Sequence, residues 1–189
     1  MCTDNVAAAQ KATNYVLDLG HRNICFLSPP LVNTSTILDR KEGFIKSHAE
    51  RGILFDESLW LTDLTCTMPD GQPNHAETMS RDIERVKTLL MHNPQITCIF
   101  AIEYNLAQIA SASVQALGKT VPDDISIVCF DSPTNVMKEY LFTHIRQREF
   151  EMGMTAVKLL RQQKQHPKDL SKVFLDADLI IEASTKAIA

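Results

Sequence analysis

The chain has 189 residues, of which 44% are hydrophobic and 22% are charged, and its formal net charge is −4. This length allows one well-filled core, or one domain together with part of a second. A net negative charge excludes binding of nucleic acid through the overall electrostatic field, so any DNA binding is expected from a segment that this sequence does not contain.

The sequence shows no targeting or membrane segment. Residues 1–10 are polar and small, without the basic start and apolar stretch of a signal peptide, and no apolar run reaches membrane-spanning length. The five cysteines are scattered and show no C-x-x-C pair, which argues against a disulfide framework. We therefore expect a reduced, cytoplasmic protein that does not contact a membrane.

Apolar residues recur with helical spacing in some segments and form short continuous runs in others. In chain order this pattern predicts a helix over 4–19, a strand over 23–27, a helix over 35–51, a weak strand over 58–63, a helix over 77–91, a strand over 95–101, a helix over 105–117, strands over 125–130 and 142–146, a helix over 149–163 and a strand near 173–181. The run 125–130 is apolar on both faces, as is typical of a parallel sheet covered by helices on both sides. This alternation predicts a doubly wound α/β fold.

Polar side chains directly follow several of these strands, and ligands of open parallel sheets bind beyond the carboxyl ends of the strands. Asp131 follows the strand 125–130 and could accept hydrogen bonds from two hydroxyl groups of a polyol, while Glu103 and Tyr104 follow the strand 95–101. Each has a plainer interpretation: an Asx turn or helix cap for Asp131, and a favourable contact with the helix dipole for Glu103. Arg40, in a charge cluster, would ordinarily be solvated, and Gln147 would be a polar loop residue.

Motifs that indicate catalysis or metal binding are missing from the sequence. It contains no G-x-S-x-G, no P-loop and no G-x-G-x-x-G, and its six glycines are dispersed. No two of the six histidines have metal-ligand spacing on one helix. We therefore expect no catalytic residues, no metal and no cofactor.

Five stretches resemble, in order and spacing, the LacI/GalR family of bacterial transcription regulators. They are LGHRNI at 19–24, RKEGF at 40–44, VPDDISIVCFD at 121–131, THIRQ at 143–147 followed by EMG at 151–153, and LIIEAST at 179–185. The resemblance implies a periplasmic-binding-protein-like fold of type I, with one complete lobe and a fragment of the other. Residues 1–141 would form the C-terminal lobe, 142–170 would be a strand and helix of the N-terminal lobe, and 171–189 would return to the C-terminal lobe. The chain would be truncated at its N-terminus, without the opening strands of the first lobe and without a helix-turn-helix or, as in arabinose repressors, GntR-like head.

The resemblance also implies a function and a site. Arg40 matches the family's effector-contacting arginine, Asp131 its hydroxyl-binding aspartate, and Gln147 the glutamine on the strand that crosses between the lobes. At the position of the family's usual Asn-Asp pair this sequence has Glu103 and Tyr104. Glu103 can still accept hydrogen bonds from hydroxyl groups, and Tyr104 offers an aromatic face. This departure leaves the identity of the ligand open.

The implied function is effector binding and homodimerisation in a repressor. A sugar or sugar phosphate would reorient the lobes and release operator DNA, which only the missing head would contact. The alternatives are a sugar-binding protein of a transport system, which shares the fold, and a doubly wound enzyme that uses Asp131 or Glu103 as acid or base.

One predicted helix carries an apolar stripe that requires a partner. Phe150, Met154, Val157 and Leu160 recur at helical spacing within 149–163, and such a stripe normally covers a sheet. The resemblance assigns that sheet to the first lobe. We therefore expect the stripe to pack against another copy of the chain or against a different surface of its own lobe. The strand 142–146 should likewise find a substitute partner or lose its strand character.

Overall fold

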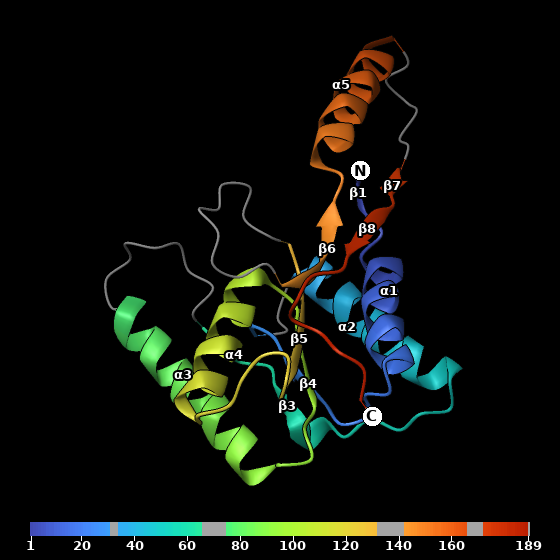
Figure 1. Cartoon of the computed structure of the whole chain (residues 1–189). Coiled ribbons are helices and arrows are strands. Elements are labelled where there is room, and N and C mark those ends of the chain that lie inside the picture. The colour runs from blue at the N-terminus through green and yellow to red at the C-terminus, as the bar shows by residue number, and fades with distance from the viewer. Residues whose placement is uncertain (31–33, 66–74, 132–141, 166–171, 189) are drawn as a thin grey trace.

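The computed structural model describes residues 1–189 except 31–33, 66–74, 132–141, 166–171 and 189 (Figure 1). A six-stranded sheet with the order β3-β2-β4-β5-β6-β8 forms its centre. The strands are β2 (Ile24–Leu27), β3 (Trp60–Leu61), β4 (Cys98–Ala101), β5 (Ser126–Phe130), β6 (Thr143–Gln147) and β8 (Ala177–Ile180). All neighbouring strands are parallel except β6 and β8, which are antiparallel.

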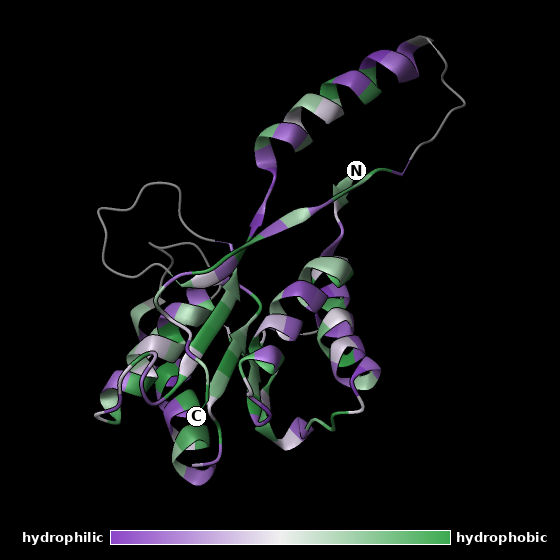
Figure 2. Cartoon of the chain, turned by 45° about the vertical axis from the view of Figure 1, so that its right-hand side comes forward, coloured by the Kyte–Doolittle hydropathy of each residue, from purple (hydrophilic) through white to green (hydrophobic). Residues whose placement is uncertain are grey.

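Helices cover both faces of this sheet. Figure 1 shows α1 (Asn5–Asp18) and α2 (Ser35–Glu50) on one side, and α3 (His75–His92) and α4 (Tyr104–Ala116) on the other. Strands β2, β4 and β5 are buried along their whole lengths, and Figure 2 shows them as hydrophobic ribbons between polar-faced helices. The doubly wound α/β fold predicted from the sequence is therefore confirmed. None of the described helices is long and apolar enough to cross a membrane.

Local chemistry explains the packing of α1 on α2. Helix α1 begins after Asp4, whose carboxylate accepts a hydrogen bond from the backbone N–H of Ala7. Gly43 of α2 lies against α1 so closely that a Cβ atom there would be 2.3 Å from the carbonyl oxygen of Val6. Glycine at this position therefore sets the distance between the two helices, and with it the position of the side chains on α2.

After β6 the chain leaves the main sheet and then returns to it. Helix α5 (Glu149–Gln165) stands apart from the body, and β7 (Phe174–Leu175) pairs in parallel with β1 (Cys2–Thr3). Strand β8 then lies beside β6, with Gln147 opposite Ala177. The segment between these two residues, 148–176, is here called the excursion.

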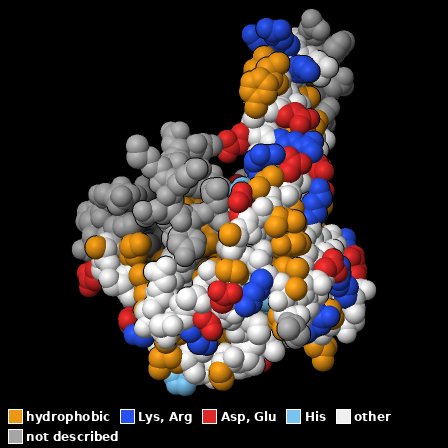
Figure 3. All heavy atoms as spheres, in the orientation of Figure 1, with side chains coloured by type: hydrophobic (Ala, Val, Ile, Leu, Met, Phe, Trp, Pro, Cys, Tyr) orange, Lys and Arg blue, Asp and Glu red, His pale blue; other side chains and the backbone are white. Residues whose placement is uncertain are grey.

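The apolar stripe of α5 is exposed, as Figure 3 shows at the top of the molecule. Phe150 is 83% exposed, and the other three members of the stripe, Met154, Val157 and Leu160, are also exposed. The expectation that the stripe packs on its own lobe is therefore wrong, because α5 stands apart from the sheet. Packing against a second copy stays a prediction.

Strand β6 joins the sheet of the preceding strands, and the predicted division of the chain before residue 142 stays a prediction. Strand β6 pairs with β5, Thr143 lying opposite Val128, so it belongs to the same sheet as the residues before it. It keeps its strand character because β5 and β8 flank it on both sides. In addition, the predicted strand 173–181 is divided between two sheets, and the weak strand 58–63 is reduced to Trp60–Leu61 after the short 3-10 helix η1 (Glu57–Leu59).

Candidate functional site

Arg40 of α2 is the centre of a polar cluster at the carboxyl ends of the strands. Its residue is only 7% exposed, so the solvated position that its charged neighbours suggested is wrong. Its Nε donates to Asn5 Oδ1 at 3.0 Å, and its Nη1 donates to the carbonyl oxygen of Ile102 at 2.6 Å. The guanidinium carbon lies 4.1 Å from the centre of the Phe130 ring. Arg40 therefore joins α1, α2 and the ends of β4 and β5.

Asp131 faces Arg40 from the end of β5. The two side chains form an ion pair of 3.7 Å between Asp131 Oδ2 and Arg40 Nη2. The backbone of Asp131 is left-handed, with φ 64°, a conformation that aspartate tolerates better than most residues. Its side chain remains 39% exposed, so this carboxylate can meet a ligand. An Asx turn would involve residues 132–141, which lie outside the described residues.

Gln147 reaches the same carboxylate from β6. Its Nε2 donates to Asp131 Oδ1 at 2.7 Å, and its Oε1 accepts from Thr3 Oγ1 at 2.7 Å. Thr3 and Asn5 were not predicted as members of the site. No local pattern could have identified Thr3, because 144 positions separate it from Gln147 in the sequence.

Glu103 and Tyr104 form the start of α4. Glu103 is the N-cap residue, but its side chain makes no capping hydrogen bond. Burial raises the pKa of the Glu103 carboxyl; Arg40 opposes this shift, and the negative charge of Asp131 adds to it. These effects place Glu103 within electrostatic reach of the cluster. The ring of Tyr104 packs at 5.8 Å from that of Phe142, and burial raises the pKa of its hydroxyl.

Among the residues that the structure describes, the cluster offers hydrogen-bond acceptors and no activated nucleophile. The carboxylates of Asp131 and Glu103 can accept from hydroxyl groups, whereas burial raises the pKa of the nearby Cys129 thiol and keeps it protonated. Within the described residues, no three His, Cys, Asp or Glu side chains come together to hold a metal ion. The arrangement therefore favours binding of a polyol.

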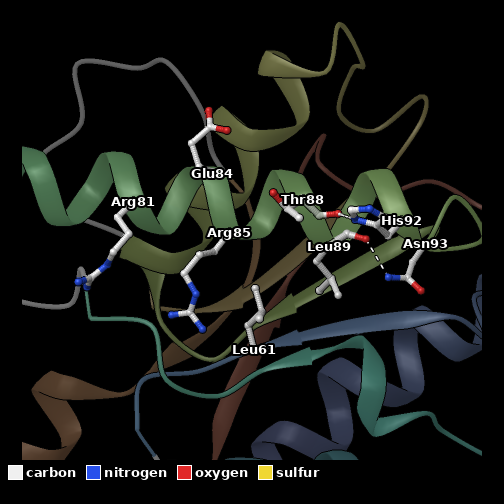
Figure 4. Close-up of a pocket in the computed structure, with 8 residues that line it drawn as sticks. All are labelled: Leu61, Arg81, Glu84, Arg85, Thr88, Leu89, His92 and Asn93. Carbon is white, nitrogen blue, oxygen red and sulfur yellow. Dashed lines mark hydrogen bonds between the residues drawn. The ribbon is translucent and has the colours of Figure 1, made fainter.

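A separate pocket of about 480 Å³ lies between α3 and the edge strand β3 (Figure 4). Its lining comprises Leu61, Arg81, Glu84, Arg85, Thr88, Leu89, His92 and Asn93. Both arginines extend from α3 toward the chain after β3, where Arg85 pairs with Asp63 and Arg81 donates to Thr65. None of the site residues predicted from the sequence lines this pocket, so the cluster around Arg40 remains the candidate site.

Comparison with known proteins places the chain in a family. Residues 13–185 match the family of the periplasmic binding protein-like domain. The chain is 30% identical over 184 residues to the HTH-type transcriptional repressor PurR of Mannheimia succiniciproducens, covering 94% of this chain and 50% of the relative. It is 28% identical over 166 residues to the HTH-type transcriptional regulator GalS of Salmonella typhimurium, covering 86% and 44%. The chain thus spans about half the length of the curated relatives that it matches.

Solved structures agree with this relationship. A LacI family transcriptional regulator from Enterococcus faecium with bound ribose superposes with a TM-score of 0.76 at 25% identity, covering 99% of this chain and 65% of that one. The regulator CelR in complex with cellobiose gives a TM-score of 0.78 at 22% identity, covering 96% and 52%, and supports the fold alone. The chain therefore belongs to the periplasmic binding protein-like domain family, and its relatives in that family are LacI-family transcriptional regulators.

Proposed function

We propose that this chain is the effector-binding part of a bacterial transcriptional repressor, and that the cluster around Arg40 and Asp131 binds the effector. The observation that carries the proposal is the convergence of Arg40, Asp131 and Gln147 from three separate elements at the carboxyl end of the sheet. Two relatives support this role, because one is named a transcriptional repressor and the other a transcriptional regulator. The ribose bound in the Enterococcus faecium structure supports it as well.

Each residue of the cluster has a distinct role in the proposal. Asp131 accepts hydrogen bonds from ligand hydroxyl groups, because its side chain is partly exposed while Gln147 and Arg40 hold it in place. Glu103 provides a second acceptor, and the half-buried ring of Tyr104 provides an apolar face for sugar C–H groups. Arg40 acts mainly by positioning Asp131, since its Nε and Nη1 already donate to the protein.

The cluster also lies where binding could be coupled to movement. Gln147 is the last residue of β6 before the excursion, and it accepts a hydrogen bond from Thr3 of β1, which pairs with β7 inside the excursion. A ligand that contacts both Asp131 and groups beyond the excursion would favour one relative orientation of the two parts. Homodimer formation and the release of operator DNA, bound by a separate head, belong to the same proposal.

The alternatives have less support. A transport-type sugar-binding protein shares the fold, but the curated relatives are regulators of transcription. An enzyme would require an acid, a base or a nucleophile beside the ligand, and the thiol of Cys129 is buried and protonated. Asp131 and Glu103 remain as carboxylates, and both are explained by recognition of hydroxyl groups.

A binding experiment tests the proposal. A thermal-shift screen with pentoses, hexoses and their phosphates, on the protein at its full natural length, identifies the effector. Asp131→Ala should then weaken its binding at least about tenfold, because a hydrogen bond to a charged group contributes about 1.5–3 kcal/mol. Asp123→Ala is the matched control, since Asp123 is an exposed aspartate that precedes the start of β5, whereas Asp131 follows its end. Unchanged affinity of Asp131→Ala in titration calorimetry would remove Asp131 from the site.

A further inference from the structure

Within the described residues, the candidate site carries more negative than positive charge. Among the described side chains, Arg40 forms an ion pair of 3.7 Å with Asp131 and donates to the carbonyl oxygen of Ile102, the residue before Glu103, so one cation lies near two carboxylates. Arg148, which follows β6, is engaged by Asp178 at 2.9 Å and by Glu151 at 3.6 Å.

Arg40 is not presented to an incoming anion. Two of its three nitrogens donate to Asn5 and to the carbonyl of Ile102, and the third faces Asp131. One face of the guanidinium lies over the ring of Phe130. A phosphate group is normally held by the free fork of an arginine through two parallel hydrogen bonds. In this site Nε and one N–H of Nη1 are engaged, Nη2 lies 3.7 Å from Asp131, and the side chain is only 8% exposed, so little of the fork can reach an incoming ligand.

Glu103, by contrast, has an unused acceptor. Its side chain is half-buried, and within the described part of the chain no hydrogen bond or ion pair holds its carboxylate. A half-buried carboxylate without a donor is costly, and burial together with the neighbouring Asp131 raises its pKa. A hydroxyl or ammonium group of a ligand would relieve this cost, whereas a phosphate would increase it.

We infer that the site selects polyols that carry no negative charge, with uncharged and amino-substituted sugars as its ligands, and that Glu103 sets this selection. The inference rests on the proposed function and narrows it, because phosphorylated sugars are excluded. Glu103 acts as a specificity-determining residue through its charge. Asp131 accepts a hydrogen bond from a ligand hydroxyl group whether or not the ligand carries a charge.

The test compares ligands that are matched in shape and differ in charge. Glucose, glucosamine and glucose 6-phosphate, together with ribose and ribose 5-phosphate, are titrated calorimetrically at pH 7.5 into the full-length protein and into Glu103→Gln. We expect each phosphate to bind at least about tenfold more weakly than its parent sugar, and glucosamine to bind at least as tightly as glucose. In Glu103→Gln the ratio between sugar and phosphate should fall about fivefold or more. Glu42→Gln, on an exposed part of α2, should leave the ratio unchanged.

Three other outcomes overturn the inference, and they separate it from the proposed function. A phosphate that binds as tightly as its parent sugar, with binding lost in Asp131→Ala, overturns the charge selection and leaves the effector site in place. A ratio that is unaffected by Glu103→Gln removes Glu103 as its determinant. Saturable binding by none of the five compounds at millimolar concentration, together with no stabilising ligand in the wider thermal-shift screen, refutes both the inference and the proposed function.

Discussion

Gly43→Ala is expected to destabilise the protein, although the same change in a helix usually stabilises it. Alanine in place of glycine in a helix interior normally contributes about 0.5–1 kcal/mol. At this position the new Cβ atom would lie 2.3 Å from the carbonyl oxygen of Val6, 2.6 Å from Ala9 Cβ and 3.1 Å from the backbone nitrogen of Gln10. Two of these three neighbours are backbone atoms, so α1 as a whole must move away from α2.

The magnitude follows from two opposing contributions. Overpacking of a filled interior costs about 1–3 kcal/mol, and a clash with backbone atoms belongs at the upper end of that range. After the helix contribution is subtracted, we expect a net loss of about 2 kcal/mol in the free energy of unfolding. For a chain of this size that corresponds to a decrease of about 4–8 °C in melting temperature. Ligand affinity should also fall, because Arg40 of α2 hydrogen-bonds to Asn5 of α1 across the displaced contact.

Gly153→Ala provides the matched control. Gly153 lies in α5, and a Cβ atom there would meet nothing within 4 Å. This variant introduces no clash, so it should leave the global free energy of unfolding within about 0.5 kcal/mol of that of the unmodified chain. Urea denaturation and differential scanning calorimetry of the two variants measure the difference. A Gly43→Ala protein as stable as the unmodified chain would refute the close approach of α1 and α2.

Three further predictions concern ionisation and exposure. Burial raises the pKa of Glu103 above its ordinary value of 4.5, so its ionisation destabilises the fold as the pH rises through the folded-state pKa. Glu103→Gln should therefore raise the melting temperature at pH 7 and lose this advantage below pH 4.5. Equal melting temperatures of the two proteins at both pH values would contradict this. Burial lowers the pKa of His48 below 6.5. The stability that the neutral His48 ring contributes is therefore present above pH 6.5 and is lost as the pH falls through the folded-state pKa. An NMR titration in which the His48 ring protonates at or above pH 6.5 would disprove this. Phe150→Ser, at a side chain that is 83% exposed, should change the free energy of unfolding by less than about 0.5 kcal/mol. It should also weaken the self-association that the exposed stripe predicts, measured by sedimentation velocity, and a clear loss of stability would show that Phe150 is packed.

The sequence predicts the central sheet well, for a physical reason. Runs such as 125–130 are apolar on both faces, and only a strand covered by helices on both sides accommodates them. The shortest strands could not be predicted in the same way. Strands β1, β3 and β7 have two residues each, and their pairing depends on which distant segment lies alongside, as with Cys2 and Phe174.

The candidate site could be predicted only in part. Asp131 and Glu103 follow buried strands, so the topology alone places them at one edge of the sheet. The burial of Arg40 could not be inferred from composition, because a run of charged residues on a helix is typical of a solvent-exposed face. Its partner Asn5 is 35 positions away, and only the packing of α1 on α2 brings the two together.

Because α5 stands apart from the sheet, it and the central sheet should differ in the free energy that is needed to unfold them. Its 17 residues expose their apolar stripe, so tertiary packing contributes little to keeping this helix intact, and helices that rely on their own hydrogen bonds are only marginally stable in water. The amides of α5 should therefore exchange with solvent deuterium through a local opening that requires far less free energy than global unfolding. The amides of β4 and β5 lie in the buried centre of the sheet and should exchange only when the whole chain unfolds. A protease would accordingly cleave within α5 first and leave the central sheet folded.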